Sequence, residues 1–475
     1  MVFNSIFFIF CFLPVFMLIY YLVPGKLRNL LLFLGSLIFY AWGEPVYVIL
    51  MLFSSIFNYY MGTELERLYY DDRKQKINLI FSIIINLAVL VFFKYYGFLL
   101  NTIGGIIGIH IPHPELSLPI GLSFYTFRNL SYLFDIYLSK VSAQRNFLTF
   151  SVYSTMFPYT SAGPIVRYTD IETQLKQRTI NIFKFGIGAE LFVKGLAKKV
   201  LLADNLSVLY SSICGHPQMS VFTSWLGILA YTMQLYFDFS GYSDMAIGLG
   251  KMLGFDFNKN FDYPYISTSV SEFWRRWHIS LSSWFREYVY IPLGGNRKGL
   301  VRQLFNIMVV WMLTGLWHGA NWNFVLWGVY YGVLLMIEKL FLLKWLDKLP
   351  NWIGHIYSMF LVVIGWTIFA QTDIHQLGEY LKTMFGIGHV AVADSDFLYF
   401  LGSNAVLLVA LIAASIDYRV WMRRLKQGKD ATVYDAIATS KGWTIAKPVL
   451  MVVFLLVSFA FLVGDSYNPF LYFRF

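Results

Sequence analysis

The sequence predicts an all-α fold, that of a polytopic integral membrane protein whose chain crosses the bilayer about 11–13 times. Hydrophobic residues make up 57% of the 475 residues and charged residues only 13%, against about 25% charged in soluble domains. Apolar runs of about 20 residues, the length that spans a bilayer as a helix, recur from one end of the chain to the other. A chain with so few charged residues cannot form a surface that faces water on all sides, so lipid must surround much of the protein.

The N-terminal half supplies the first group of predicted spans. Residues 5–23 are apolar, with no basic region before them and no small-residue cleavage site, so we expect a retained first span and not a signal peptide. The short segments 29–42 and 46–62 are separated by Gly43-Glu44-Pro45, and predict either two tilted spans or a helical hairpin. The longer apolar runs of this half are 78–100, 118–137, 185–203 and 220–240.

One apolar run differs from the others. Residues 147–165 are interrupted by Pro158 and Pro164. Proline breaks a helix interior, so we expect this segment to re-enter the membrane without crossing it. The C-terminal half resumes the full-length pattern. Its predicted spans are 303–317, 322–338, 351–370, 398–416 and 448–464.

The positions of the positive charges predict the orientation, because Lys and Arg gather in cytosolic loops. The segments after the first, third and fifth spans are basic, whereas 43–45 and 101–117 contain no Lys or Arg. We therefore expect the N-terminus outside, 251–302 and 417–447 in the cytosol, and 204–218 outside. The net charge of +10 has the same explanation, so we expect the lipid bilayer, and no nucleic acid, as a partner.

The segment 271–299 is too polar to span the membrane and too aromatic to be a free loop. At helical spacing its aromatic side chains form a broad apolar face with arginines opposite, which predicts an amphipathic helix lying in the cytosolic interface. His278 falls on the same turn as Trp274 and Trp277. A histidine on an aromatic face is more often structural than catalytic, so the residue pattern alone leaves both roles open.

His318 lies between two apolar spans and is flanked by Gly315 and Gly319. Ionisable groups at membrane depth are costly and are functional candidates for that reason. Histidine suits proton abstraction because its unperturbed pKa of about 6.5 lies near working pH. The competing interpretation is a histidine that only packs helices. Asn321 and Asn323 are candidates to orient the ring or to bind substrate.

Other polar groups have less specific patterns. Asp238 and Asp244 are expected either to pair with the arginines of 275–286 or to line a pore, and the structural role is favoured. Arg128 and Asp135, two helical turns apart, are expected to form a buried ion pair. The chain has no P-loop, nucleophile elbow, dinucleotide fingerprint or metal-like cysteine spacing. We therefore expect no bound cofactor and no metal.

Seven motifs together resemble the membrane-bound O-acyltransferase family. They are Pro119–Phe127, Ala162–Arg167, Tyr236–Ala246, Phe273–Leu281, Pro292–Lys298, Gly315–Ala320 and Asn468–Phe475. The resemblance is closest to the bacterial branch with the alginate O-acetyltransferase membrane subunit, peptidoglycan O-acetyltransferases and D-alanyl transfer proteins. It spans nearly the whole chain, and its 271–320 block is highly specific.

The resemblance implies a single domain over 1–475, with N-terminal helices at 1–117, a catalytic core at 118–340 and C-terminal helices at 341–475. In the family fold, tilted helices form a ring around a central funnel that is thinned from both sides. His318 aligns with the principal catalytic histidine of the family and His278 with its second motif histidine.

The function that we expect is transfer of an acyl group, most simply acetyl, from a cytosolic thioester to a hydroxyl outside the membrane, in polysaccharide O-acetylation. Acetyl-CoA or an acyl carrier would be the donor. The resemblance also implies a bacterial cytoplasmic membrane and an extracytoplasmic partner of the SGNH-hydrolase type. We expect His318 and His278 to be catalytic. The candidate substrate-binding residues are Asn321, Trp317, Arg275, Arg276, Trp274, Asp238 and Tyr242.

Three alternatives remain at this point. The first is a D-alanyl or lipid acyltransferase of the same family. The second is a transporter or channel in which Asp238, Asp244, Arg128 and His318 line a path, although the chain lacks the internal repeats of many transporters. The third is a structural membrane subunit whose histidines only pack.

Overall fold

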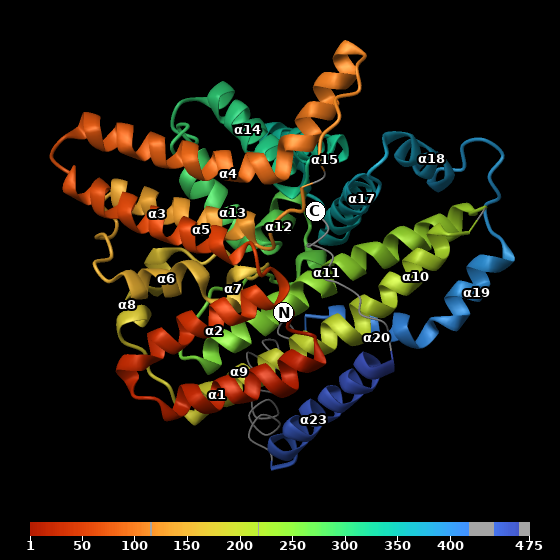
Figure 1. Cartoon of the computed structure of the whole chain (residues 1–475). Coiled ribbons are helices and arrows are strands. Elements are labelled where there is room, and N and C mark those ends of the chain that lie inside the picture. The colour runs from red at the N-terminus through yellow and green to blue at the C-terminus, as the bar shows by residue number, and fades with distance from the viewer. Residues whose placement is uncertain (115, 217, 418–440, 465–475) are drawn as a thin grey trace.

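Every regular element in the described part of the chain is a helix, so the all-α prediction is confirmed (Figure 1). Most of the predicted loop 417–447 and the whole terminal motif 468–475 lie outside the described residues. The computed structural model describes residues 1–114, 116–216, 218–417 and 441–464.

Within these residues, six helices are long and apolar enough to cross a membrane, or seven if a helix pair bent by 63° counts as one span. This confirms a polytopic membrane protein, with fewer full-length spans than the about 11–13 expected from runs of apolar residues. The difference arises largely because several runs form single helices of only 16 residues, shorter than a full span. The six candidate spans are Val48–Arg67, Asp72–Ile107, Leu300–His318, Trp322–Leu346, Asn351–Ala370 and Ile445–Gly464.

The N-terminal helices form one side of the molecule. The break at Gly43-Glu44-Pro45 separates two helices that make few contacts with each other and pack mainly on other helices, so they are not a packed hairpin. In Figure 1 the turn after the first helix and the turn before α4 lie on the left, with α8, whereas α18 lies on the right. The helices are α1 (Leu13–Leu22), α2 (Arg28–Gly43), α3 (Val48–Arg67), α4 (Asp72–Ile107), α5 (Leu122–Tyr137) and α8 (Tyr168–Lys176).

The proline-interrupted segment forms two short buried helices, α6 (Phe147–Thr155) and α7 (Phe157–Thr160). Nine helical residues cover roughly 14 Å, about half of the ~30 Å hydrocarbon core, so neither helix crosses it. The lengths of the two helices agree with the expectation that this segment enters the membrane without crossing it.

The predicted Arg128–Asp135 pair is wrong. The Arg128 guanidinium donates to the backbone carbonyls of Tyr159 at 2.9 Å and Ser154 at 3.2 Å, where the chain breaks between α6 and α7. Carbonyls at a helix end have no partner within the helix, so they accept from a donor nearby. Two turns along α5 separate Arg128 from Asp135 by roughly 10 Å, too far for a direct contact.

The long central helix α11 (Val221–Met252) packs on α9 (Ile182–Ala197) through pairs of glycines. A Cβ atom on Gly195 would lie 2.4 Å from the Gly241 carbonyl oxygen. Small residues let membrane helices approach this closely. Residues 204–218, expected as an external loop, begin instead with α10 (Asp204–Cys214), which packs on α11.

The segment 271–299 is not a single interfacial helix. It forms α12 (Val270–Arg276), α13 (Ile279–Phe285) and a π-helical turn, with a sharp break at His278. Its aromatic side chains, among them Trp277 and Trp284, are buried in the protein core and not in lipid. The expected apolar face exists, but α11, α14 and their neighbours cover it.

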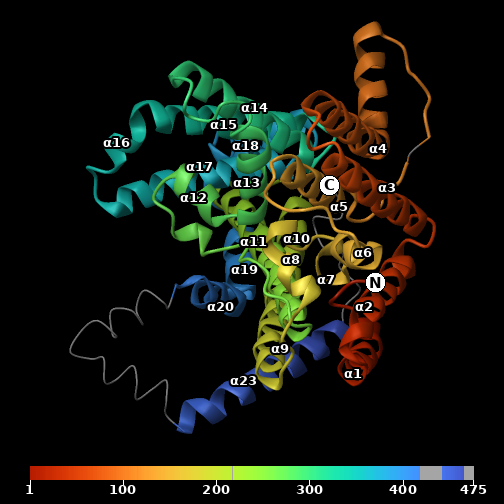
Figure 2. The same cartoon turned by 90° about the vertical axis from the view of Figure 1, so that its left-hand side faces the viewer.

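The C-terminal helices complete the wall around this core (Figure 2). In that view α14 and α15 lie beside α13, and α17 lies close to α12. They are α14 (Leu300–His318), α15 (Trp322–Ile337), α16 (Leu343–Leu346), α17 (Asn351–Ala370), α18 (Ile374–Met384), α19 (Ser395–Ser403), α20 (Ala405–Ser415) and α23 (Lys441–Gly464).

Candidate active site

His318 is the last residue of α14, where the chain turns back into α15. Gly319 follows it in extended backbone, and the helix ends there. The two helices cross closely at Gly315, where a Cβ atom would lie 2.3 Å from the Phe324 carbonyl oxygen. A larger residue would separate the helices one turn before His318. The imidazole therefore sits at the end of a tightly packed helix pair.

Aromatic rings surround the His318 imidazole, which is only 3% exposed. The ring centroids of Trp317 and Trp327 lie 4.9 Å away and that of Phe369 lies 5.3 Å away. Asn323, a candidate to orient the imidazole, instead donates to backbone carbonyls at the end of α17, the nearer at 3.2 Å. It therefore fixes the helix that carries Phe369 against the histidine.

His278 lies in the break between α12 and α13. Its φ of 44° is in the left-handed region, which residues with a Cβ atom rarely adopt. The ring packs edge-on against Phe239 at 4.7 Å and lies 5.9 Å from the Trp317 ring. Because Trp317 also contacts His318, one indole neighbours both histidines. The structure brings the two predicted catalytic residues into one aromatic cluster.

A buried carboxylate positions the helix that leads into His278. The two oxygens of Glu338 accept hydrogen bonds from the backbone N–H groups of Val270 at 2.7 Å and Ser271 at 2.8 Å. The first N–H groups of a helix have no partner within it, and negative charge is favoured at that end. The segment after α15 therefore sets the position of α12.

Asn260 determines which nitrogen of His278 carries the proton. Its Oδ1 lies 3.1 Å from His278 Nδ1 and accepts from the Ser280 backbone N–H at 3.2 Å, a group that can only donate. Its Nδ2 donates to Ser243 Oγ at 3.0 Å. The atom that faces Nδ1 is therefore an acceptor, and Nδ1 carries the proton. His278 Nε2 keeps its lone pair and makes no hydrogen bond to the described part of the chain.

Burial keeps this ring neutral. Desolvation lowers the pKa of the His278 imidazole to about 3, so the ring is uncharged near neutral pH. A neutral imidazole with its proton on Nδ1 accepts a hydrogen bond at Nε2 and cannot donate one there. His278 is therefore equipped to accept a hydrogen bond at Nε2, whereas polarising a carbonyl group requires a donor.

The His318 side chain borders a small space, called here the narrow cavity. Its volume is about 40 Å³, room for only a few water molecules. The ring is therefore not sealed within packed helices, but an acyl thioester can reach it only after the cavity walls separate. The lining consists of Lys94, residues 118–124, Ser161, Trp317 and His318.

A second space of about 610 Å³, called here the wide cavity, lies next to it between α4 and the turn before α15. Asn321, predicted to bind substrate, lines the wide cavity together with Asn101 and His113. Its other lining groups include aromatic rings and a threonine. Lys94 lines both cavities, so the two spaces meet at this side chain.

Helix α4 holds the end of α14 through two consecutive residues. Lys94 Nζ donates to the Trp317 carbonyl oxygen and lies 3.3 Å from that of His318. The Tyr95 hydroxyl donates to the Leu316 carbonyl at 2.6 Å. The last carbonyls of an α-helix lack partners within the helix, so these contacts satisfy three of them. Neither residue was among those that the sequence motifs indicated.

The three predicted substrate-binding residues on α12 lie outside both cavities. Trp274 is buried, with its ring 5.5 Å from that of Trp327, so it packs on a ring that contacts His318 and not on His318 itself. Arg275 is exposed, and Arg276 forms an ion pair with Glu272 at 2.8 Å. Arg275 is therefore the more accessible of the two arginines.

The two carboxylates of α11 pair with lysines and not with the arginines that the sequence suggested. Asp238 lies 2.8 Å from Lys199 Nζ, and Asp244 lies 2.6 Å from Lys198 Nζ. The lysines follow α9, which packs along α11, so the helix packing decides the partner. Tyr242 is buried on the same helix. None of these residues lines the narrow cavity with His318, so this space is not the path that the transporter alternative predicted.

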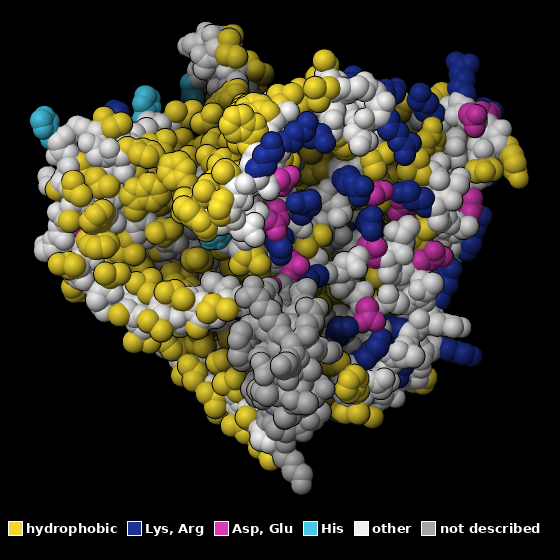
Figure 3. Space-filling view, turned by 180° about the vertical axis from the view of Figure 1, so that it is seen from behind, with side chains coloured by type: hydrophobic (Ala, Val, Ile, Leu, Met, Phe, Trp, Pro, Cys, Tyr) yellow, Lys and Arg dark blue, Asp and Glu magenta, His cyan; other side chains and the backbone are white. Residues whose placement is uncertain are grey.

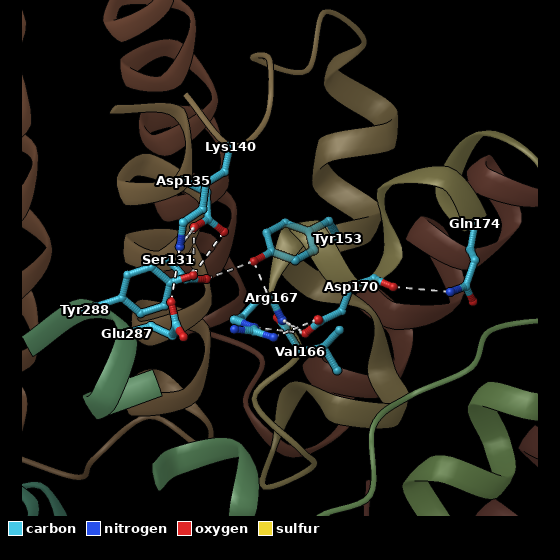
Figure 4. A network of polar contacts seen from close by, with 10 residues as sticks. All are labelled: Ser131, Asp135, Lys140, Tyr153, Val166, Arg167, Asp170, Gln174, Glu287 and Tyr288. Atoms are coloured by element: carbon cyan, nitrogen blue, oxygen red, sulfur yellow. Dashed lines mark hydrogen bonds and ion pairs between the residues drawn. The ribbon is translucent and has the colours of Figure 1, made fainter. Parts of the chain in front are cut away.

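Polar contacts also tie α5 to the segment after α13 (Figure 4). The Tyr288 hydroxyl lies 2.9 and 3.0 Å from the two oxygens of the buried Asp135 carboxylate. Lys140 Nζ lies 3.6 Å from Asp135 and 3.3 Å from Glu287. Asp135 thus has a hydroxyl and an ammonium group as partners, and the π-helical turn is held against α5.

On the face seen in Figure 3, charged side chains gather in the centre and on the right, whereas hydrophobic side chains cover most of the left. The exposed basic residues of 271–302 are Arg275, Arg286, Arg297, Lys298 and Arg302. This separation is expected for a membrane protein, in which charged surfaces face water and apolar surfaces face lipid.

Comparison with known proteins gives consistent results. The sequence model of the membrane-bound O-acyltransferase family matches residues 45–350, which include both histidines. A probable alginate O-acetylase of Pseudomonas putida is 38% identical, over 100% of both chains. A peptidoglycan O-acetyltransferase of Helicobacter pylori is 30% identical over 100% of this chain and 98% of its own. A teichoic acid D-alanyltransferase of Bacillus subtilis is 27% identical over 56% of this chain and 72% of its own.

Proposed function

The chain belongs to the membrane-bound O-acyltransferase family, and from that premise we propose that it acetylates a polysaccharide of the cell surface. It is a membrane O-acyltransferase, an enzyme that moves an acyl group onto a hydroxyl. In our proposal the donor is a cytosolic thioester, acetyl-CoA or an acylated carrier, and the acceptor hydroxyl lies beyond the membrane. No resident cofactor is needed, because a thioester is already activated for acyl transfer.

The relatives favour acetyl over D-alanyl as the group transferred. The alginate and peptidoglycan enzymes align over the whole of this chain, whereas the teichoic acid enzyme aligns over 56% of it. Polysaccharide is the acceptor class that the names of the two full-length relatives have in common. An extracytoplasmic partner of the SGNH-hydrolase type, passing the group to the glycan, remains part of the proposal.

The observation that carries the proposal is the position of His318, which borders the narrow cavity at the end of α14. Its imidazole removes the proton from the acceptor hydroxyl. The oxygen then forms a bond to the acyl carbon, the carbon–sulfur bond breaks, and the departing thiolate takes the proton from the imidazolium. Alternatively, the imidazole carries the acyl group covalently between donor and acceptor.

The hydrogen bonding of His278 limits the catalytic role that this ring can have. With its proton on Nδ1, the ring cannot donate from Nε2 to a thioester carbonyl. We assign the His278 Nε2 atom to accept a hydrogen bond from the bound acyl donor. The carbonyl group must therefore be polarised by another side chain.

We also propose the side from which each substrate arrives. The basic residues of 271–302 offer an anionic donor such as acetyl-CoA a docking surface in the cytosol. The wide cavity, beside the Lys-free and Arg-free segment 101–117, offers the acceptor a path from outside. With this arrangement we propose that the N-terminus lies outside and that the protein resides in the bacterial cytoplasmic membrane.

The test uses membranes from cells that lack the natural chain and are resupplied with wild type or a variant. Acetyl-CoA labelled in the acetyl group is the donor, and labelled ester on polysaccharide is measured together with released thiol. His318→Ala should abolish transfer, whereas His375→Ala, at an exposed histidine on α18, should not. Wild-type turnover by the His318 variant would remove this residue from the mechanism.

A further inference from the structure

Lys94 lies in the candidate membrane span α4, and its side chain is turned toward the end of α14. Ionisable residues within a span are costly and mark functional sites more often than not. No carboxylate in the described part of the chain forms an ion pair with it. Its charge faces instead the negative end of the α14 dipole and the Trp317 ring, whose centroid is 5.8 Å from Nζ.

The donor groups of Lys94 are not all used by these contacts. An ammonium group has three N–H donors, and a carbonyl oxygen can only accept. The carbonyls of Trp317 and His318 take two of the three. One N–H remains, and the side chain borders both the narrow and the wide cavity. A free donor therefore stands where the two cavities meet, next to His318.

We propose that Lys94 is a catalytic residue, whose ammonium group stabilises the negative charge that develops on the acyl carbonyl oxygen beside His318. This inference rests on the proposed function, and it supplies the hydrogen-bond donor that His278 cannot be. As the acceptor oxygen bonds to the acyl carbon, the carbonyl electron pair moves onto oxygen, and Lys94 donates to that oxyanion. The carbonyl re-forms when the carbon–sulfur bond breaks.

A merely structural role gives a different expectation. If Lys94 only satisfied the end of α14, removing the neighbouring contact of Tyr95 would have a similar effect, because both residues bind carbonyls of the same turn. Stabilisation of an oxyanion requires charge, whereas satisfying a carbonyl requires only an N–H or O–H group. Charge and capping can therefore be separated by substitution.

The experiment uses the same membranes and labelled acetyl-CoA, and compares Lys94→Met, Lys94→Arg and Tyr95→Phe with wild type. Lys76→Met is the matched control, an exposed lysine at the other end of the same helix. Loss of an oxyanion donor should lower kcat about 100- to 1,000-fold in Lys94→Met. KM for acetyl-CoA should stay within about threefold, because the interaction forms only in the transition state. Lys94→Arg should recover part of the rate, Tyr95→Phe should lose much less activity than Lys94→Met, and Lys76→Met should stay near wild type.

Equal losses in Lys94→Met and Tyr95→Phe, a change in KM alone, or full activity of Lys94→Met would overturn the inference. If Lys94→Met does not assemble, Lys94→Gln makes the same comparison, because it keeps N–H donors for the carbonyls without the charge. The activities of wild type and of His318→Ala show whether a failure concerns the proposed function or only the role of Lys94. Wild-type membranes that transfer no acetyl group contradict the proposed function, whereas a fully active Lys94→Met beside an inactive His318→Ala contradicts only the role of Lys94.

Discussion

The His278 Nδ1 atom donates to the Asn260 side-chain oxygen at 3.1 Å, across 18 residues of chain. The same oxygen accepts from the backbone and the hydroxyl of Ser280, so it is held by three donors. Such a partner orients the ring and decides its tautomer, as partners of functional histidines commonly do. Asn260 therefore acts through His278, as a positioning residue.

Asn260→Leu should lower acetyl transfer about 10- to 100-fold, because the ring can then rotate or carry its proton on Nε2. Asn260→Asp keeps the acceptor oxygen and should retain more activity. The new carboxylate favours the protonated ring and so raises the pKa of His278. On acidification, the variant should therefore lose activity at a higher pH than wild type does. The measurement is the rate of acetyl transfer from labelled acetyl-CoA in membranes, across pH 5–8. Identical pH profiles for Asn260→Asp and wild type would contradict the assigned contact.

Gly315→Ala should separate α14 from α15, because the new methyl group would lie 2.3 Å from the Phe324 carbonyl oxygen. Overpacking of this kind costs about 1–3 kcal/mol and should also displace His318, one turn away. Both the melting temperature in detergent and the transfer rate should fall. Gly378→Ala, where no atom lies within 4 Å of the new methyl group, is the control and should melt at or above the wild-type temperature. Equal behaviour of the two variants would show that the close crossing is unimportant.

Glu338→Ala should destabilise the protein by about 1–3 kcal/mol, because a buried and a partly buried N–H group of α12 lose their acceptor. Glu338→Gln keeps one oxygen as an acceptor and should be affected less. Glu379→Ala removes a carboxylate that is 72% exposed, and should leave thermal stability unchanged. Thermal unfolding of the three variants in one detergent gives the comparison. A Glu338→Ala protein as stable as Glu379→Ala would mean that the α12 cap contributes nothing.

Tyr288→Phe removes the hydroxyl that binds both oxygens of Asp135, whose side chain is 1% exposed. A buried carboxylate that loses a donor should cost about 1–3 kcal/mol. Adding Asp135→Asn should then cost less than it does alone, because the two groups form one contact. Tyr399→Phe, at a residue that is 69% exposed, is the control for loss of a hydroxyl. Strict additivity of the Asp135 and Tyr288 substitutions would argue against the contact.

The lowered pKa of His278 predicts a dependence of stability on pH. Below an ordinary pKa of about 6.5 the unfolded ring binds a proton, whereas the folded ring stays neutral down to about 3. The unfolded state therefore binds more protons between these values, and the free energy of unfolding falls as the pH falls from 6.5 toward 3. His278→Gln removes this titration. Its melting temperature should fall less on acidification than that of wild type, and parallel curves would contradict the burial of a neutral ring.

Composition and hydropathy were sufficient to predict the class of this protein. An apolar chain with 13% charged residues has only one solvent that can cover it, and backbone groups in lipid must bond internally, so helices follow. The break at Gly43-Glu44-Pro45 and the proline-interrupted 147–165 also follow from local chemistry. The motifs around His278 and His318 indicated the family, which the comparisons confirm.

Contacts between distant segments needed the tertiary structure. The apolar face of 271–299 has the same sequence pattern whether lipid or protein covers it. In the structure, α11 and α14 pack on this face, so protein covers it. Arg128, Asp238 and Asp244 had several possible partners in the sequence, and the helix that packs alongside each one selected the actual partner. Asn260 and Lys94 carry no motif, because their importance comes from the atom that each side chain meets. Periodicity along a chain describes which face of a helix is apolar, whereas the fold alone brings a distant side chain such as Asn260 within hydrogen-bonding distance of the His278 ring.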